Sequence, residues 1–221
     1  MRGRFAPSPT GQMHLGNAWT ALLAWLQVRA GKGQLVLRME DLDPDRSRTE
    51  YVEGLEKDLR WLGLDWEEGG DLGGAYGPYE QDKRRGLYEE ALQRLRRQEL
   101  IYPCYCTRAE LAASAPHCED GERIYQGTCA SGVAGSKLTR KPSLRLKVPE
   151  EEIVFEDGVY GLVRQNLRQE CGDFVVRRSD GVHAYQLAVV VDDALMGITH
   201  VLRGADLLSS TPGLLYLYRL L

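Results

Sequence analysis

The chain has 221 residues, of which 43% are hydrophobic, and its formal net charge is −4 at pH 7. A chain of this length can bury one good core, or one core with a small satellite. It contains neither an apolar run long enough to cross a membrane nor a signal peptide, so we expect a cytoplasmic protein. The acidic balance is also unlike that of a dedicated nucleic-acid binder, although local basic patches could still steer a polyanion.

The N-terminal stretch predicts a strand, a loop and a helix in succession. An apolar strand start runs into a loop with two prolines and a glycine, and apolar residues then recur at helical spacing. These apolar residues are Leu15, Ala18, Trp19, Leu22, Leu23 and Leu26. The free amides and the positive dipole end of such a helix suit an anion such as a nucleotide phosphate. His14 would stand there as a donor to phosphate oxygens, although an ordinary strand–helix connection with a capping histidine is the simpler interpretation of this pattern alone.

A short buried strand is predicted next, from Gln34 to Met39, and it ends in a cluster of acidic residues. Acidic residues at the carboxyl end of a strand lie where open α/β sheets bind ligands. Glu40 is therefore a candidate for holding an ammonium group. Structural capping by Asp41 or Asp43 is the competing role for this cluster.

Two amphipathic helices follow, with a glycine-rich acidic loop from Asp65 to Gly77 between them. The first spans Arg48 to Leu62, and the second spans Lys83 to Leu100 with its basic residues facing outward. Their expected inward residues are Val52, Leu55, Leu59 and Leu62 in the first, and Leu87, Ala91, Leu92 and Leu95 in the second. Alternating strands and helices predict an α/β fold with a parallel sheet.

The composition changes between Ile101 and Leu138, where four of the five cysteines and a histidine cluster. Thiolates are preferred zinc ligands, and a polar, glycine-rich segment needs something to order it, so we expect tetrahedral zinc here. The ordinary chemical choice of ligands is Cys104, Cys106, Cys118 and Cys129, with His117 close by. Reduced cysteines without a metal are the alternative.

Beyond a linker at Ser131 to Ser136, strands are predicted from Leu144 to Val148 and from Ile153 to Val163, which suggests an inserted antiparallel hairpin. The strand Asp173 to Arg178 is expected to return to the main sheet. The predicted fold is thus a Rossmann-like, doubly wound parallel sheet with an inserted zinc-binding, antiparallel β subdomain. We expect its parts at residues 1–100, 101–170 and 171–221.

Two stretches resemble the class I aminoacyl-tRNA synthetases of the glutamyl and glutaminyl branch. Pro-Ser-Pro-Thr-Gly at residues 7–11 and His-Leu-Gly-Asn at residues 14–17 resemble the HIGH-type signature of that family. The second stretch runs from Tyr185 to Asp193 and continues from Gly197 to Leu208. Its Tyr-Gln-Leu-Ala and Arg-Gly-Ala-Asp-Leu are most similar to the glutamyl-Q tRNA(Asp) synthetases, small relatives of glutamyl-tRNA synthetase.

The resemblance implies an enzyme that uses L-glutamate and ATP, with magnesium accompanying the nucleotide. Catalysis would involve His14 and Asn17. The implied ATP-binding residues are Pro9, Thr10, Gly11, His14, Gly16 and Asn17, and the implied glutamate-binding residues are Arg4, Ser8, Glu40, Tyr185 and Arg203. Glutamate carries two carboxylates and one ammonium group, which the charges in this set would match, and glutamine would leave one charge unpaired. Considered without the resemblance, Arg203 could equally be a surface residue at the end of a strand.

The same family implies a different zinc site, in which Cys-x-Cys is followed by Tyr-x-x-x-Cys. Cys104, Cys106, Tyr125 and Cys129 match that pattern position for position. His117 and Cys118 have no place in it, so the fourth ligand stays open. Cys171 stands apart and is interpreted as a core thiol.

The implied reaction is the formation of glutamyl-adenylate, followed by transfer of glutamate to the queuosine base in the anticodon of tRNA(Asp). One alternative is the catalytic domain of a glutamyl-tRNA synthetase that charges tRNA(Glu). Another is a non-catalytic glutamate- or RNA-binding remnant, because no lysine-bearing KMSKS-type loop lies between Gly204 and Leu221 and the sequence stops in a helix predicted from Thr211. The sequence gives no indication of an oligomeric state.

Overall fold

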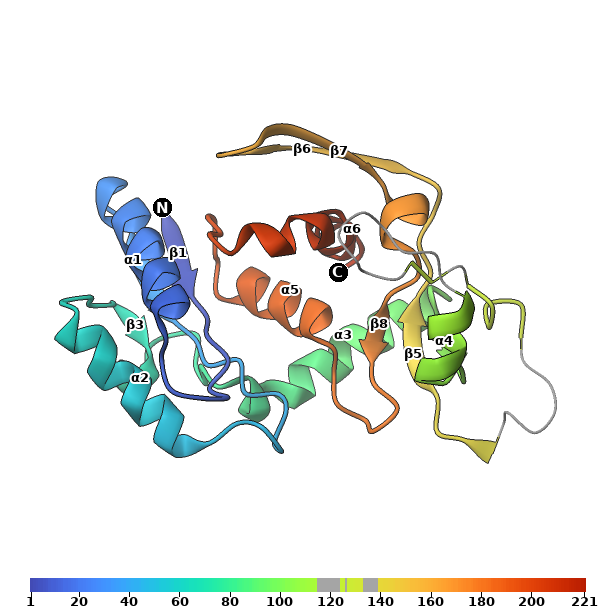
Figure 1. Cartoon of the computed structure of the whole chain (residues 1–221), viewed down its shortest axis with the longest axis horizontal. Coiled ribbons are helices and arrows are strands. Elements are labelled where there is room, and N and C mark those ends of the chain that lie inside the picture. The colour runs from blue at the N-terminus through green and yellow to red at the C-terminus, as the bar shows by residue number, and fades with distance from the viewer. Residues whose placement is uncertain (115–123, 126, 133–138) are drawn as a thin grey trace. The chain divides into compact units, whose positions relative to one another are not determined.

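The computed structural model describes residues 1–114, 124–125, 127–132 and 139–221 (Figure 1). It divides into two compact units, one made of Met1–Tyr88 with Val191–Ala205 and the other of Glu89–Val190 with Asp206–Leu221. The strands are β1 (Arg2–Phe5), β2 (Gln34–Leu37), β3 (Glu68–Gly69), β4 (Ile101–Cys104), β5 (Ser143–Leu146), β6 (Glu152–Asp157), β7 (Gly161–Asn166) and β8 (Val175–Arg177). The α-helices are α1 (Leu15–Ala30), α2 (Thr49–Trp61), α3 (Arg85–Arg97), α4 (Arg108–Ser114), α5 (Tyr185–Leu195) and α6 (Thr211–Leu220). Shorter helical turns cover Gly70–Leu72, Gln81–Arg84, Leu167–Cys171 and Ala205–Ser210.

The first unit contains the predicted parallel sheet, with its strands in the order β1-β2-β3. On the other side of β1, Gly3 forms a parallel bridge with His200, so the chain returns to this sheet after α5. The two neighbours of β1 in this sheet therefore come from opposite parts of the sequence, β2 on one side and the segment at His200 on the other. Such a reversal of strand order is typical of Rossmann-like folds, and ligands bind at the carboxyl ends of the strands beside it.

Alternation along β2 decides what each face of this sheet carries. Leu35 and Leu37 are buried in one hydrophobic cluster with residues of α1 and α2, whereas Val36 between them is buried against Tyr79 and Met196. Successive strand residues point to opposite faces, so the two helices cover one face and the segments around residues 79 and 196 cover the other. The second of these faces carries the candidate site.

The buried face of α1 differs from the expected one. Leu15, Trp19 and Leu26 are 85%, 58% and 47% exposed, and the helix instead buries Ala21, Ala24 and Val28. The physical reason is close approach to β1, because a Cβ atom on Gly3 would lie only 2.5 Å from the Val28 side chain. Small residues bring this helix to the sheet, with Leu22 and Trp25 packed at the edge of the core and Leu15, Trp19 and Leu26 on the outer side.

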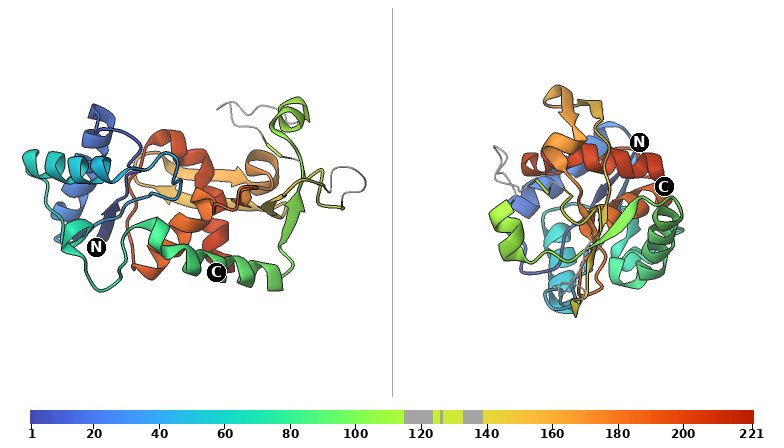
Figure 2. Two further views of the ribbon diagram at one scale, coloured as in Figure 1. Left: turned by 90° about the horizontal axis from the view of Figure 1, so that it is seen from below. Right: turned by 90° about the vertical axis from the view of Figure 1, so that its right-hand side faces the viewer.

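The second unit contains an antiparallel sheet in the order β4-β5-β8. The expectation that Asp173 to Arg178 returns to the main sheet is therefore wrong, because β8 pairs with β5. The inserted hairpin is present, but β6 and β7 form it within residues 152–166, without β5 (gold in Figures 1 and 2). An antiparallel bridge between Arg177 and His183 closes the turn at Ser179 to Gly181.

Several smaller predictions differ from the structure or lie outside the residues it describes. The predicted acidic loop contains the short strand β3, and Leu62, expected to face inward from the helix Arg48 to Leu62, is 41% exposed. Arg203 does not end a strand, since the only pairing assigned nearby in the described chain is the bridge at His200. Residues 133–136 of the predicted linker, and His117 with Cys118, lie outside the described residues. The three predicted segments, 1–100, 101–170 and 171–221, remain a prediction.

None of the helices within the described ranges combines the length and the apolar character that crossing a lipid bilayer would require.

Candidate functional site

Backbone hydrogen bonds join the loops that follow β1 and β2. The amide of Glu40 donates to the carbonyl oxygen of Pro7 at 2.9 Å, and the amide of Arg48 donates to that of Pro9 at 3.2 Å. Both loops leave the carboxyl ends of parallel strands, where α/β sheets bind ligands. The loop that contains the exposed Ser8 therefore lies beside the acidic segment that begins at Glu40.

His14 precedes α1, and its imidazole caps the helix. Its Nδ1 atom accepts the backbone N–H of Gly16 at 3.1 Å, and its own backbone N–H donates to Oδ1 of Asn17 at 3.4 Å. Because an accepting ring nitrogen carries no proton, this bond assigns the ring proton to Nε2. The capping role and the donor role proposed for His14 are thus compatible, since capping uses Nδ1 and leaves the exposed Nε2–H for another acceptor.

The first turn of α1 is favourable for an anion in two further respects. It contains no acidic side chain, so nothing there opposes the positive end of the helix dipole. Gly16 also keeps space for the histidine, because a Cβ atom on it would lie 3.1 Å from Cε1 and 3.2 Å from Nδ1 of the His14 ring. A side chain at residue 16 would displace the imidazole.

Strand register places two arginines on the face of the sheet opposite α1 and α2. Arg4 is paired with Val36, and Arg38 lies two residues beyond Val36, so all three side chains share one face. Arg4 is 5% exposed and Arg38 is fully buried. A buried guanidinium requires nearby acceptors, and these come mainly from the end of α5.

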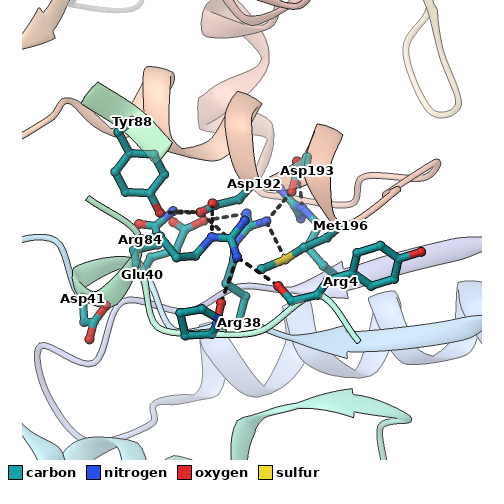
Figure 3. Close-up of polar contacts among 12 residues, drawn as sticks. Arg4, Arg38, Glu40, Asp41, Arg84, Tyr88, Asp192, Asp193 and Met196 are labelled. Carbon is teal, nitrogen blue, oxygen red and sulfur yellow. Dashed lines mark hydrogen bonds and ion pairs between the residues drawn. The ribbon is translucent and has the colours of Figure 1, made fainter. Parts of the chain in front are cut away.

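Asp193 of α5 accepts hydrogen bonds from both arginines (Figure 3). Its Oδ1 atom lies 2.6 Å from Nη1 of Arg38, and its Oδ2 atom lies 3.4 Å from Nε of Arg4. The other guanidinium nitrogens reach the rest of the site. Nη2 of Arg38 donates to Oε1 of Glu40 at 3.1 Å, and Nη1 of Arg4 donates to the carbonyl oxygen of Leu202 at 3.1 Å.

Asp192, the preceding residue, faces a different set of partners (Figure 3). Its Oδ1 atom accepts from Nε of Arg84 at 2.6 Å, and its Oδ2 atom accepts from Gln81 and from the Tyr88 hydroxyl, each at 2.8 Å. Arg84 also donates to two backbone carbonyl oxygens in the segment before it. These bonds tie α5 to residues 76–88 and hold the neighbouring Asp193 in place.

Burial and charge act in opposite directions on this cluster. Burial raises the pKa of Glu40 above its usual range, and the positive charges of Arg38 and Arg4 only partly offset the effect. Burial alone would lower the pKa of Arg38, but Asp193, Glu40 and Asp192 outweigh it and raise that pKa. Three arginines (Arg4, Arg38 and Arg84) face three carboxylates (Glu40, Asp192 and Asp193), so their charges balance within this cluster.

The structure brings most of the predicted ligand-binding residues of the first unit together. Arg4 and Glu40 are linked through Asp193 and Arg38, and Arg203 directly follows Leu202, whose carbonyl oxygen binds Arg4. Ser8, Pro9, Thr10 and Gly11 lie in the loop next to Glu40, and His14, Gly16 and Asn17 form the start of α1. Tyr185 belongs to the second unit, so its part in this site remains a prediction.

Asp41 and Asp43 have the structural capping role that the sequence suggests for them, because each accepts a backbone N–H. Oδ1 of Asp41 accepts the backbone N–H of Asp82, next to the start of the turn Gln81–Arg84, and Oδ1 of Asp43 accepts that of Asp45. Burial raises the pKa of Asp41 as well. Among these three acids, only Glu40 pairs with the buried arginine at the end of β2.

Sequence reasoning gave no role to Arg38, Arg84, Asp192 or Asp193. Arg84 belongs to the basic run Lys83-Arg84-Arg85, which is typical of a solvated surface, yet it is 3% exposed. The available signal was a charge within an apolar run, since Arg38 stands between Leu37 and Met39, and the two aspartates follow Val189 to Val191. Charged residues in such runs are buried and must be paired.

A second candidate site lies in the other unit, where the thiols of Cys104, Cys106 and Cys129 lie within 4.8 Å of one another. The Tyr125 hydroxyl is 3.5 Å from the sulfur of Cys104 and 3.7 Å from that of Cys106, and the sulfurs of Cys106 and Cys129 are 3.5 Å apart. Ligand atoms around a tetrahedral zinc ion with Zn–S bonds of about 2.3 Å are about 3.8 Å apart. These four side chains therefore fit such an ion.

The thiols of this cluster differ in acidity. Burial alone would raise the pKa of Cys104, but contacts with Tyr125, the Cys106 backbone and Arg145 lower it to about 7. Burial raises the pKa of Cys106 to about 11. Arg145 contributes from above the Tyr125 ring, with its guanidinium carbon 3.9 Å from the ring centre, so a positive charge lies beside the thiols.

Comparisons with known proteins agree with these features. All of residues 1–221 match the family model of the tRNA synthetases class I (E and Q), catalytic domain. A glutamyl-Q tRNA(Asp) synthetase from Nitratidesulfovibrio vulgaris is 54% identical, over 100% of this chain and 70% of that protein. A glutamate–tRNA ligase from Sulfurihydrogenibium sp. is 44% identical, over 100% of this chain and 47% of that protein. The crystal structure of a glutamate tRNA ligase from Elizabethkingia meningosepticum, in complex with its amino acid, matches with a TM-score of 0.81 and 30% identity, over 99% of this chain and 46% of the other.

Proposed function

The chain belongs to the class I tRNA synthetases for glutamate and glutamine, whose catalytic-domain model it matches throughout, and we propose that it activates L-glutamate with ATP and transfers the glutamate to RNA. The observation that carries this proposal is the link from Arg4 through Asp193 and Arg38 to Glu40. It joins a cation suited to a carboxylate with an anion suited to an ammonium group, at the carboxyl edge of the parallel sheet.

The proposed amino-acid site uses Arg4, Ser8, Glu40, Tyr185 and Arg203. Glu40 would hold the ammonium group, and Arg4 and Arg203 would hold the two carboxylates of glutamate. Two guanidinium groups would then match the two carboxylates of glutamate, and the carboxylate of Glu40 would match its ammonium group. Glutamine would leave a buried positive charge without its partner, which explains discrimination against it.

The proposed nucleotide site is the start of α1 with the loop before it, Pro9, Thr10, Gly11, His14, Gly16 and Asn17, and magnesium would accompany ATP. The α-carboxylate of glutamate attacks the α-phosphate in line, a P–O bond forms, and pyrophosphate leaves. His14 donates its Nε2–H to phosphate oxygens on which negative charge develops, and the helix dipole acts in the same direction. The chain's own contribution is therefore positioning and charge stabilisation.

We propose that Cys104, Cys106, Tyr125 and Cys129 hold one structural zinc ion. The distances between their ligand atoms support this set, and Tyr125 also accepts the backbone N–H of Cys129 at 2.9 Å, which orients its hydroxyl toward the thiols. The bound ion would cross-link β4 to the segment around residues 125–129.

We propose the queuosine base in the anticodon of tRNA(Asp) as the acceptor. The support is the higher identity to the glutamyl-Q tRNA(Asp) synthetase, 54%, than to the glutamate–tRNA ligase, 44%. A cytoplasmic location follows from these substrates and is part of the same proposal.

Glutamate-dependent ATP–pyrophosphate exchange without tRNA tests activation, and transfer of labelled glutamate tests the acceptor. We expect exchange without tRNA, and transfer to tRNA(Asp) carrying queuosine but not to unmodified tRNA(Asp). Charging of tRNA(Glu) instead would make the protein a glutamate–tRNA ligase. Absence of exchange with every tRNA, in a protein that binds glutamate, would indicate a non-catalytic relative.

A further inference from the structure

We propose that Asp193 is a positioning residue for the amino-acid site, which keeps Glu40 available for the ammonium group and Arg4 available for a carboxylate of glutamate. This inference rests on the proposed function. Asp193 does not itself contact the amino acid in this proposal. It acts by occupying one side of the Arg38 guanidinium and by holding Arg4.

The Arg38 guanidinium is shared between Asp193 and Glu40. Its Nη1 atom donates to Asp193 at 2.6 Å, and its Nη2 atom donates to Oε1 of Glu40 at the longer distance of 3.1 Å. An arginine beside a single carboxylate tends to form two parallel hydrogen bonds with it. Asp193 takes Nη1, so Arg38 cannot bind Glu40 through both of its Nη atoms, and the remaining Nε atom faces Asp192 at 3.8 Å.

Glu40 keeps one carboxylate oxygen available for the ammonium group. Its side chain is 8% exposed, and only Oε1 has a side-chain hydrogen bond to a described residue. Oε2 is therefore the atom that could accept an ammonium N–H. If Arg38 closed on both oxygens of Glu40, its charge would compete with the ammonium group for the same carboxylate.

Arg4 is 5% exposed and has its Nε atom 3.4 Å from Oδ2 of Asp193. Its Nη1 atom donates to the carbonyl oxygen of Leu202. These two bonds fix the direction of the guanidinium before any ligand arrives, so less conformational freedom is lost on binding. The carboxylate of Asp193 thus orients Arg4 directly and Glu40 through Arg38, the two charged groups proposed to bind the amino acid.

Asp192 provides a matched control, because it is adjacent, equally buried and part of the same cluster. Asp192 and Asp193 are 0% and 2% exposed, but the hydrogen bonds of Asp192 go to Arg84, Gln81 and Tyr88, and its contact with Nε of Arg38 is a longer ion pair of 3.8 Å. Replacement of either aspartate by asparagine removes one buried negative charge at constant shape. A merely structural role predicts the same outcome for both variants.

The test is calorimetric titration of the full chain with L-glutamate and, separately, with a non-hydrolysable ATP analogue. For Asp193→Asn we expect glutamate to bind at least roughly tenfold more weakly, about 1.4 kcal/mol, with unchanged affinity for the analogue. For Asp192→Asn we expect a lower melting temperature and a clearly smaller loss of glutamate affinity than for Asp193→Asn, because Asp192 has no hydrogen bond to Arg4 or Arg38. Arg38→Lys should resemble Asp193→Asn, because one ammonium group cannot hold two carboxylates in this geometry, and it serves if Asp193→Asn does not fold.

A double-mutant cycle then tests whether Asp193 acts through Glu40. In a Glu40→Gln background, Asp193→Asn should weaken glutamate binding much less than it does in the wild type. The positioning role would be overturned if Asp192→Asn and Asp193→Asn lost equal glutamate affinity. It would also be overturned if the fold-losses of Glu40→Gln and Asp193→Asn simply multiplied in the double mutant. Either result would leave the proposed function intact. A wild-type protein that binds no glutamate would overturn both.

Discussion

The backbone N–H of Gly16 donates to Nδ1 of His14, and this single bond of 3.1 Å determines where the histidine proton lies. It assigns the proton to Nε2, on the ring edge that the helix cap does not use. In the proposed reaction, the capping bond would prepare the imidazole as a donor before a nucleotide binds, so the ring would not need to reorient.

Replacement of His14 by alanine should slow ATP–pyrophosphate exchange by roughly 100- to 1,000-fold, the usual cost of one lost transition-state donor. Glutamate affinity should stay close to wild type, because the imidazole is outside the arginine–carboxylate cluster. Exchange kinetics with calorimetry of glutamate binding separates the two effects. A large loss of glutamate affinity with unchanged turnover would contradict this role.

Gly16→Ala should reproduce part of the His14 defect, because the added methyl group would lie 3.1 Å from the ring and displace it. Gly54→Ala is the matched control. It lies inside α2, where a Cβ atom would meet nothing within 4 Å, so it should keep full activity and gain up to about 1 kcal/mol of stability. Equal activity in both variants would show that the ring position is unimportant.

As the pH is lowered, glutamate affinity should begin to fall at a higher pH than it would if Glu40 had the pKa of an ordinary glutamate side chain. Burial raises the pKa of Glu40, so this residue takes up its proton at a higher pH and then no longer attracts the ammonium group. The side-chain carboxyl of free glutamate, with a pKa of about 4.3, is still ionised in that range. Calorimetry between mildly acidic and neutral pH should show the decline in the wild type, and a flat, weak response in Glu40→Gln.

Arg84→Met should destabilise the protein by roughly 3–5 kcal/mol, because it leaves the buried carboxylate of Asp192 without its ion-pair partner. Lys83→Met is the control at the adjacent position. Lys83 pairs with Glu80 at the surface with its side chain 63% exposed, and solvent screens such pairs so that they contribute little to stability. Thermal or urea unfolding of the two variants measures the difference, and similar losses would contradict the importance of the buried pair.

Metal analysis of purified protein should give one zinc ion per chain. Cys104→Ser should lose it, and Tyr125→Phe should bind it more weakly, because each removes one of four ligand atoms. Cys171→Ser, outside the cluster, should retain the metal. Full metal content in both Cys104→Ser and Tyr125→Phe would rule out this ligand set.

The sequence predicted local elements of the first unit well because their signals are local. The helices at α1 and α2 and the strand at β2 follow from hydrophobic spacing and from the glycines between them. The buried face of α1 was not predictable, since it depends on how closely the helix approaches Gly3 of β1. Likewise, β8 has an ordinary strand pattern, and only tertiary structure shows that its partner is β5.

The candidate site was predicted in part for the same reason. Motifs identified Arg4, Glu40 and His14, each of which stands next to a turn or strand end. They did not identify Arg38 or Asp193, because the link between these residues joins positions 155 apart in the sequence. Such a link depends on the bridge between Gly3 and His200, which brings the end of α5 back to the sheet.

The alternation within β2 has a consequence for protein engineering. Leu35 and Leu37 point into the core, whereas Val36, and Arg38 just after the strand, point to the face that carries the candidate site. An insertion or deletion of one residue there would exchange the two sets, so folding and substrate choice would fail together. Attempts to give this domain a new amino-acid preference should therefore leave the strand untouched and vary the loops at its carboxyl end.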